Sequence, residues 1–243
     1  MRVLGIETAT AICAAAVVEH GRTLAEQSIE APHIHSERLM SLIDQSLHSA
    51  GVDVSAIDGL AISIGPGSFT GLRIGLSVAK GLAYAVGKPI VAVPTLEALS
   101  YCAVKHGAGE DDQFILPMID ARRDEVYAGL YRWRRGKLEE VIPPRSLILK
   151  DYEELLPVSN KRVVITGNGT EKFQQYVLKN NVQETLRFVF PRKDSGRCSA
   201  VTVALLGEEK LTLGEVSDVS TLEPLYVKDF HTLVKTQHPA VTL

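Results

Sequence analysis

A glycine-rich stretch at positions 65–75, GPGSFTGLRIG, holds the residues best placed for chemistry. It follows an apolar run at 58–64 and precedes a helical pattern from about Thr70 to Val86. A strand that turns through glycines into a helix leaves backbone N–H groups at the positive end of the helix, where an anion can bind. The stretch therefore offers candidate phosphate contacts at Gly65, Pro66, Gly67 and Ser68.

The same stretch departs from the two common nucleotide-binding motifs. In the P-loop motif a lysine and a serine or threonine follow the last glycine, whereas Leu72 and Arg73 follow Gly71 here. The dinucleotide motif G-x-G-x-x-G also differs, because this stretch has one more residue between its second and third glycines. A structural turn with a Ser68 or Thr70 helix cap is the alternative, and both interpretations stay open.

Two carboxylates, Glu7 and Asp120, end the apolar runs at 3–7 and 114–120. Actin-like ATPases use acidic residues at such points to organise metal and water around phosphates, beside a hairpin whose glycine lets the backbone touch phosphate. Here alanine stands where the first hairpin needs that glycine, and arginines follow the second carboxylate. General acid–base catalysis demands that geometry, so we predict no catalytic residue. Glu7 and Thr8 remain candidate phosphate contacts.

Two histidines, His33 and His35, resemble part of a metal site. Histidines at i and i+2 on a strand face the same side, which suits zinc. Glu37 is close in sequence, but the third ligand is unclear, and Leu39 stands four residues after His35, where a helical site would need a ligand. We therefore favour exposed histidines ahead of a helix and predict no metal.

Composition restricts the classes of protein that this chain can belong to. Hydrophobic residues make up 45% of the 243 residues and charged residues 23%, which is typical of a globular chain with a real core. The net charge of −3 argues against binding nucleic acid without a local basic patch or a partner. No signal-peptide core or membrane-length apolar run is evident, so we expect a cytoplasmic protein without membrane contact.

The cysteines are expected to be reduced and inert. Cys13, Cys102 and Cys198 lie far apart, in apolar contexts and without metal or redox spacing.

Cations gather between positions 122 and 137, in RRDEVYAGLYRWRRGK, with Trp133 among them. Cations beside an aromatic ring can bind RNA, whereas a solvated β-hairpin is the simpler explanation of such a pattern. Both interpretations stay open. The cations are Arg122, Arg123, Arg132, Arg134, Arg135 and Lys137.

The order of the predicted elements indicates a duplicated α/β unit. The first copy consists of strands at 3–7, 12–18 and 23–29, a helix from Ser36 to Ala50, a strand–glycine turn–helix at 58–86, a strand at 88–94 and a helix at 96–104 capped by Thr95. The second copy consists of strands at 114–120, 125–133 and 138–141, and a strand–glycine turn–helix at 162–178.

A polar segment at 105–113 is the expected boundary between the two copies. We predict an N-terminal lobe at 1–104, completed by a helix at about 199–211. A C-terminal lobe at 105–198 and a C-terminal segment at 212–243 complete the chain.

The helix from Thr70 to Val86 carries a stripe of small residues spaced four apart, with an apolar row beside it. Glycine inside a helix costs about 1 kcal/mol relative to alanine, so such a stripe usually lets another backbone come close. Packing on the protein's own sheet and contact with a second chain are the two explanations, and both can hold on different faces. The stripe is Gly71, Gly75, Ala79, Ala83 and Gly87, and the apolar row is Ile74, Val78, Leu82 and Val86.

Six stretches together resemble the TsaB family, also called YeaZ, in the right order over nearly the whole chain. The most specific is GPGSFTGLRIGLSVAKGLA at 65–83. The resemblance implies the two-lobe actin-like and Hsp70-like (ASKHA) fold, in which each lobe is a mixed β-sheet with packed helices. The other stretches are IETAT at 6–10, HSERLM at 35–40, VPTLEAL at 93–99, IDARRDEVYAG at 119–129 and EPLYVKD at 223–229.

The resemblance also implies a non-catalytic subunit. Such a subunit binds and supports the related transferase TsaD, together with the ATPase TsaE, in threonylcarbamoylation of the adenosine beside the anticodon of ANN-decoding tRNAs. The chain would reach tRNA indirectly through the complex and form a homodimer when alone. No cofactor of its own is implied, and ATP or ADP would bind at the junction with partners.

The family comparison also bears on metal binding. TsaD holds its metal through an H-x-x-x-H motif, whereas here His35 is kept and Leu39 takes the second place. This departure implies no metal and no transfer activity of the chain itself. A free-standing enzyme, either an ATPase or a glycoprotease-like metallopeptidase, is the alternative.

Family members dimerise through two N-lobe helices, which match Ser36–Ala50 and Thr70–Val86 here. The implied interface residues are Leu39, Leu42, Ile43, Gly71, Leu72, Ile74, Gly75, Val78, Ala79 and Leu82.

Overall fold

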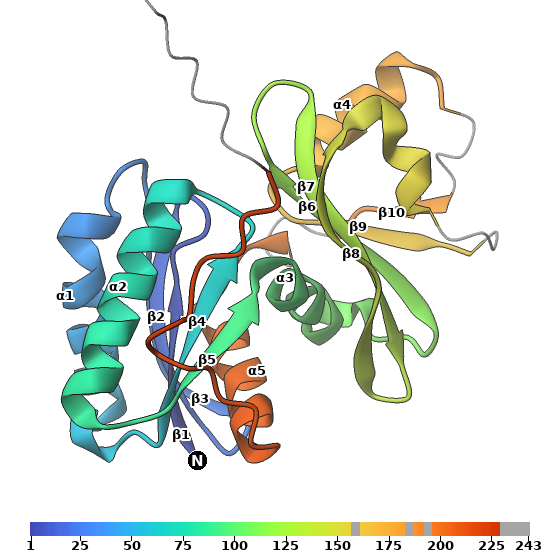
Figure 1. The fold of residues 1–243 in the computed structure, drawn as a ribbon. Coiled ribbons are helices and arrows are strands. Elements are labelled where there is room, and N and C mark those ends of the chain that lie inside the picture. The colour runs from blue at the N-terminus through green and yellow to red at the C-terminus, as the bar shows by residue number, and fades with distance from the viewer. Residues whose placement is uncertain (157–160, 183–186, 192–195, 229–243) are drawn as a thin grey trace, which may run out of the picture.

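Two β-sheets organise the computed structural model, which describes residues 1–156, 161–182, 187–191 and 196–228 (Figure 1). The strand order is β3-β2-β1-β4-β5 in the first sheet and β8-β7-β6-β9-β10 in the second. In each sheet the first three strands pair antiparallel, and the last two run parallel to the first. The repeated order confirms the duplicated two-lobe α/β fold with a mixed sheet in each lobe.

The strands lie close to their predicted positions. The first sheet consists of β1 (Arg2–Glu7), β2 (Ile12–Glu19), β3 (Arg22–Glu30), β4 (Gly59–Gly65) and β5 (Ile90–Pro94). The second consists of β6 (Gln113–Asp120), β7 (Glu125–Arg134), β8 (Lys137–Ile148), β9 (Val163–Thr166) and β10 (Phe188–Val189). Strand β8 runs well beyond the predicted 138–141, because register shifts in its pairing with β7, between Ala128 and Tyr131, accommodate the Pro143–Pro144 pair.

Helices cover the sheets in layers. Helices α1 (His35–Ala50) and α2 (Phe69–Val86) pack on one face of the first sheet, and α3 (Thr95–Ala103) and α5 (Ala200–Thr212) pack on the other. Helix α4 (Thr170–Lys179) and the short helix η3 (Leu149–Leu155) cover one face of the second sheet. Strand β2 is apolar at almost every position because both of its faces are covered. Two further short helices are η1 (Val54–Ala56) and η2 (Val104–Ala108).

Helix α3 lies between the lobes and gives them a common core (Figure 1). Its apolar side chains belong to one buried cluster with residues of β2 and of the second sheet. Because this cluster includes both sheets, the lobes are joined by buried apolar contacts as well as by the chain. Its buried members include Leu96, Leu99 and Ala103 of α3, Ile12, Ala14 and Ala16 of β2, and Ile115, Ile119 and Tyr131 of the second sheet.

Helix α5 returns the chain to the first sheet after the second lobe. Gly5 of β1 permits this contact, because a Cβ there would lie 2.7 Å from the Cβ of Ala204 and overlap the carbonyl oxygen of Ala200. The helix predicted at 199–211 therefore packs on the N-terminal sheet. The exact lobe boundaries at 104 and 198 stay a prediction.

Residues 213–228, which we call the C-terminal strap, cross the first lobe and reach the second (Figure 1). The Ser217 N–H donates to the Ile90 carbonyl at 2.8 Å, and the Leu225 N–H donates to the Ile64 carbonyl at 2.7 Å. Val219 and Leu222 pack on the core beneath α1 and α2. The strap thus protects the edge of β5 and holds the end of β4. The rest of the predicted C-terminal segment lies outside the described residues.

The small-residue stripe of α2 faces the protein's own first lobe. A Cβ on Gly71 would overlap the carbonyl oxygen of Thr8, and a Cβ on Gly75 would overlap its Oγ1 atom. Ala79 is fully buried. Packing on the protein's own sheet therefore explains Gly71, Gly75, Ala79 and Ala83 of this stripe, whereas Gly87 is exposed. Contact of these small residues with a second chain stays an untested prediction that their burial disfavours.

Two glycines of α2 should respond oppositely to alanine. Gly75→Ala should destabilise the fold by about 2 kcal/mol or more, because the new methyl overlaps Thr8 and lies 3.2 Å from the Cδ1 atom of Ile62. Gly81→Ala should stabilise it by up to about 1 kcal/mol, because nothing lies within 4 Å of the new methyl and alanine favours a helix. Urea unfolding of both variants measures this, and similar effects of the two substitutions would refute the orientation of α2.

Candidate docking face and interlobe cleft

The turn between β4 and α2 packs backbone against backbone on the turn between β1 and β2. The Ser68 N–H donates to the Ala9 carbonyl at 2.7 Å, and a Cβ on Gly67 would overlap that same oxygen. The Gly65 N–H donates to Thr95 Oγ1 at 3.0 Å, and the Gly71 N–H to Ser68 Oγ at 3.2 Å. The amides of Gly65, Ser68 and Gly71, which could help to hold an anion, are thus occupied by the chain's own oxygens.

This geometry favours the structural interpretation of the glycine-rich stretch. Ser68 caps α2 as the alternative expected, whereas Thr95 does not cap α3, because its hydroxyl serves the Gly65 amide instead. The turn does not fit a phosphate group at Gly65, Pro66, Gly67 or Ser68. Phosphate contact there stays an untested prediction that the geometry disfavours.

Glu7 is completely buried at the end of β1. Its Oε1 atom accepts the Ala9 N–H, while Oε2 has no hydrogen-bond partner among the described residues. Burial raises the pKa of Glu7 to about 7, against the opposing effect of hydrogen bonds from Ala9 and Ser63. The neighbouring Thr8 is also fully buried, so neither side chain of this candidate pair is accessible to a phosphate in this structure.

Asp120, the counterpart of Glu7 in the second lobe, has very different surroundings. It is exposed, pairs with Lys172, and accepts the Arg122 N–H at 2.7 Å. Glu7 is thus buried with one carboxylate oxygen lacking a hydrogen-bond partner among the described residues, whereas Asp120 forms a surface ion pair. The two do not form a matched acid–base pair in this structure, and the absence of a catalytic role stays a prediction.

The histidine and cysteine candidates also lie apart. His35 is buried with its Nε2 atom 3.3 Å from the Ile12 carbonyl oxygen, whereas His33 is exposed. Within the described part of the chain, no group of three His, Cys, Asp or Glu side chains is arranged to hold a metal ion. The cysteines are buried free thiols, and burial raises the pKa of Cys13 and Cys102 to about 11, which disfavours the nucleophilic thiolate.

An open cleft of about 520 Å³ lies between the lobes, and the sequence had not singled it out. The turn between β1 and β2 forms one wall, and the glycine turn before α4 forms another. Gly167, with φ of +94°, lets this turn approach the backbone of Met118. The repeated strand–glycine turn–helix at 162–178 was the available signal. Its lining includes Thr10, Ala11, Ile12, Glu30, Thr166, Asn168, Glu171 and Arg197.

The cleft has the size of a small-molecule site, but its charges do not suit a nucleotide. The carboxylates of Glu30 and Glu171 line it, and both would repel phosphates. The lining guanidinium of Arg197 already pairs with Glu30. These charges disfavour a nucleotide in this cleft.

The outward faces of α1 and α2 form the second candidate site. Most of the implied interface residues are buried in the core of the lobe: Leu39, Leu42, Ile43, Gly71, Leu72, Gly75 and Ala79. The phase of each helix turns them toward the sheet, which disfavours contact with a partner, and their assignment to the interface stays an untested prediction. Ile74, Val78 and Leu82 are partly exposed and stay a prediction.

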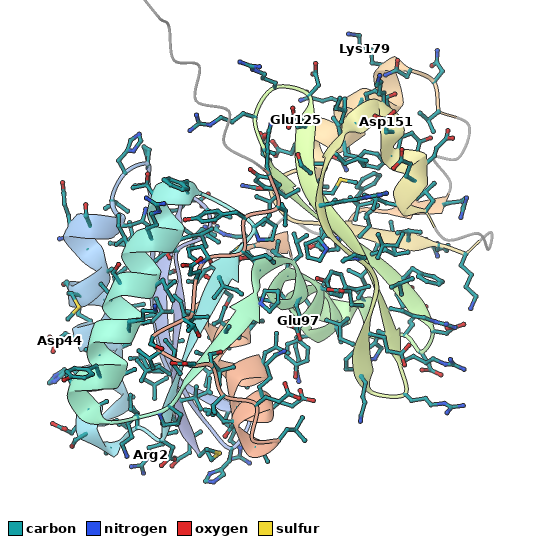
Figure 2. The ribbon with its side chains drawn as sticks, viewed as in Figure 1. Arg2, Asp44, Glu97, Glu125, Asp151 and Lys179 are labelled. Carbon is teal, nitrogen blue, oxygen red and sulfur yellow. The ribbon has the colours of Figure 1, made fainter. Side chains whose placement is uncertain are left out.

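The side chains that do face outward include two large apolar residues and a row of small ones. Tyr84 of α2 is 87% exposed, and Met40 of α1 is 53% exposed. Figure 2 shows Asp44 on the same outer side of α1, pointing away from the sheet. On α2 the exposed row is Ser77, Gly81 and Ala85, spaced four apart. Sequence reasoning missed this row because the inner stripe has the same spacing.

Comparison with known proteins agrees with this architecture. Residues 28–234 match the family model described as "TsaD: tRNA N6-adenosine threonylcarbamoyltransferase". The chain is also 32% identical to the tRNA threonylcarbamoyladenosine biosynthesis protein TsaB of Bacillus subtilis (strain 168), over 94% of each protein. The chain belongs to the TsaB family. It is also 36% identical to TsaB of Escherichia coli (strain K12), over 70% of this chain and 72% of that protein.

Solved structures place the TsaB family among the actin-like folds. The structure of YeaZ from Pseudomonas aeruginosa has a TM-score of 0.76 and 26% identity, and the match covers 93% of this chain and 99% of that one. EutJ from Carboxydothermus hydrogenoformans, at a TM-score of 0.53 and 12% identity, shares the fold alone. Among the described residues, no helix is long and apolar enough to span a bilayer.

The burial of Glu7 predicts a specific pH dependence. Its folded pKa lies above the unfolded value, so its contribution to stability is complete below about pH 4.5 and is lost as pH rises through about 7. At pH 8 the free energy of unfolding of Glu7→Gln should therefore exceed that of the native chain by up to about 3 kcal/mol, and at pH 5 the two should be nearly equal. Urea unfolding at both pH values measures the difference. Asp44→Asn, the same change at an exposed site, is the control. An equal effect of Glu7→Gln at both pH values would contradict the prediction.

Proposed function

We propose that this chain is a non-catalytic docking subunit that binds and supports TsaD in threonylcarbamoylation of tRNA. The family membership supports the pathway, because relatives are named for tRNA threonylcarbamoyladenosine biosynthesis. The outer face of α1 and α2, which we call the docking face, supports the role. It is defined by Met40, Ser77, Gly81, Tyr84 and Ala85.

The single observation that carries the docking role is the exposure of Gly81 inside α2. This glycine is exposed inside a helix, and nothing lies within 4 Å of the position of its missing Cβ. It costs about 1 kcal/mol of helix stability relative to alanine, and no contact among the described residues requires it. With Ser77 and Ala85 one turn away on either side, it leaves a shallow groove that another helix backbone can approach. Tyr84 on the same helix and Met40 on α1 supply exposed apolar anchors of the kind that dominate interfaces.

The buried candidates for chemistry support the absence of catalysis. Glu7 and Thr8 are inaccessible, and the amides of Gly65, Ser68 and Gly71 are used within the chain. A transferase needs accessible groups at the reacting centre, and these positions offer none.

The match to the TsaD family model also suggests how the partners assemble. Two related chains can pack corresponding helices against each other about a near two-fold axis, as in an isologous dimer. We propose that the docking face takes TsaD in the active complex and a second copy of this chain when it is alone. TsaE and an ANN-decoding tRNA would join the complex with TsaD, and ATP or ADP would bind at the junction with these partners, in the cytoplasm.

Substitutions on the docking face should weaken TsaD binding without unfolding the chain. Tyr84→Ala should lower the affinity for TsaD about tenfold or more, because it removes a large exposed anchor. Gly81→Arg should abolish close helix packing. Titration calorimetry with TsaD and an assay of tRNA threonylcarbamoylation measure both effects.

Leu178→Ala on α4 is the matched control, because Leu178 is 73% exposed but lies on the other lobe. It should leave affinity unchanged, and thermal unfolding should show all three variants folded. Wild-type affinity and tRNA modification with both docking-face variants would disprove the assignment. Threonylcarbamoylation or ATP hydrolysis by the purified chain alone would disprove the non-catalytic role.

A further inference from the structure

The turn between β6 and β7 presents two adjacent arginines in an unusual backbone conformation. Arg122 and Arg123 have φ values of 70° and 49°, in the left-handed region that residues with a side chain rarely adopt. Each such residue costs of the order of 1 kcal/mol, and glycine or asparagine would relieve that strain. Both side chains are exposed, and among the described residues no ion pair holds either guanidinium.

Two carboxylates flank this turn, and each forms an ion pair with a lysine. Asp120 accepts the Arg122 N–H and pairs with Lys172. Glu125, labelled at the turn between β6 and β7 in Figure 2, pairs with Lys228 of the strap. Two carboxylates close to the arginines are thus already matched by lysines, and Asp124 between them is exposed. Positive charge is therefore in excess at the tip of the turn.

The strap places Tyr226 next to this turn, where it packs with Phe69 and Arg73 of α2. Tyr226 packs on Phe69 with ring centroids 5.3 Å apart, and its hydroxyl accepts the Arg73 Nε–H at 3.0 Å. The Arg73 guanidinium lies 3.8 Å from the centroid of the Phe69 ring. Tyr226 remains 39% exposed. An accessible ring held rigid beside a guanidinium is a platform on which an unpaired base can stack.

Contacts across the lobes make these groups one surface. Lys228, two residues after Tyr226, pairs with Glu125 of β7. The pKa of Glu125 is lowered, first by its hydrogen bond with Lys228 and also by the charge of Arg123. We call this surface the basic corner, and it consists of Phe69, Arg73, Arg122, Arg123, Tyr226 and Lys228.

We propose that the basic corner contacts the tRNA directly, with Arg122 and Arg123 on backbone phosphates and Tyr226 against an unpaired base. The proposal deepens the proposed function, on which it rests, since it gives this chain its own contact with the RNA. A guanidinium forms paired hydrogen bonds with phosphate oxygens, and adjacent arginines can hold adjacent phosphates. An acidic protein segment would also pair with the arginines, but it would not use the exposed Tyr226 ring as a stacking platform.

The structure also divides the arginine-rich stretch that the sequence presented as one hairpin. Arg122 and Arg123 precede β7, whereas Arg134 ends it and Arg135 follows it. A strand of that length separates the two ends by roughly 30 Å. At the far end, Arg132 and Lys161 both pair with Asp112, and the Arg135 N–H is bound by Asp111. The far end is a matched control because it has the same residue type at the opposite end of the same strand.

The test compares two double variants in the complex with TsaD. Arg122→Gln/Arg123→Gln should weaken binding of unmodified ANN-decoding tRNA roughly five- to twentyfold and reduce the slope of log affinity against log salt by about 1 to 1.5. Arg134→Gln/Arg135→Gln should leave both within experimental error. Tyr226→Leu should weaken tRNA binding severalfold without changing the salt slope, because it removes stacking but no charge. Fluorescence anisotropy at several salt concentrations measures each.

The outcomes separate this proposal from the proposed function. Unchanged tRNA affinity of the Arg122/Arg123 variant, with TsaD binding intact, would overturn the basic corner and leave the docking role. Loss of TsaD binding by that variant would make the corner a protein contact and overturn the RNA assignment. If the native chain failed to bind TsaD, the docking role would fail, and the same titrations on the chain alone would decide the corner. Thermal unfolding shows whether a variant is misfolded. The single variant Arg123→Lys keeps the charge and should bind tRNA nearly as well as the native chain, in contrast to Arg122→Gln/Arg123→Gln.

Discussion

The contact between α2 and the turn after β1 is the constraint on which the rest of the structure depends. Three glycines, Gly67, Gly71 and Gly75, let the turn and the start of this helix lie directly on the backbone of Thr8 and Ala9 and on the Thr8 hydroxyl. Any side chain at these positions would separate the helix from the sheet. The contact has two consequences. It occupies amides that could have bound a phosphate, and it fixes which side of α2 faces solvent.

The same contact disfavours a phosphate group at this turn. Ala9 stands close to Gly67 and provides its carbonyl oxygen to Ser68, so protein fills the space next to the helix end. Glu7 is enclosed behind this packing, where its pKa rises to about 7. A carboxyl in such surroundings is inaccessible to a ligand in this structure. The accessible features of the molecule lie elsewhere, on the outer side of α2 and at the corner where the strap meets the second lobe.

Two kinds of contact hold the lobes together. Helix α3 joins them by an apolar core that includes both sheets. The C-terminal strap joins them at the surface, by hydrogen bonds to the first sheet and the Lys228–Glu125 pair. The apolar core supplies most of the stability, because exposed ion pairs contribute little. The strap instead fixes the positions of Tyr226 and Arg73, which makes it a positioning element for the surface between the lobes.

Much of the architecture follows from the sequence by itself. Apolar runs, turn glycines and their repetition gave the strands, the main helices and the two-lobe duplication, because these patterns act over a few residues. The motif around 65–83 indicated the family. The tertiary structure decided what local patterns leave ambiguous. Two rows of small residues on α2 have the same spacing, and only packing against Thr8 shows that Gly75 is inside and Gly81 outside. The cationic stretch at 122–137 is one segment in sequence but two sites in space, because an extended strand separates its ends.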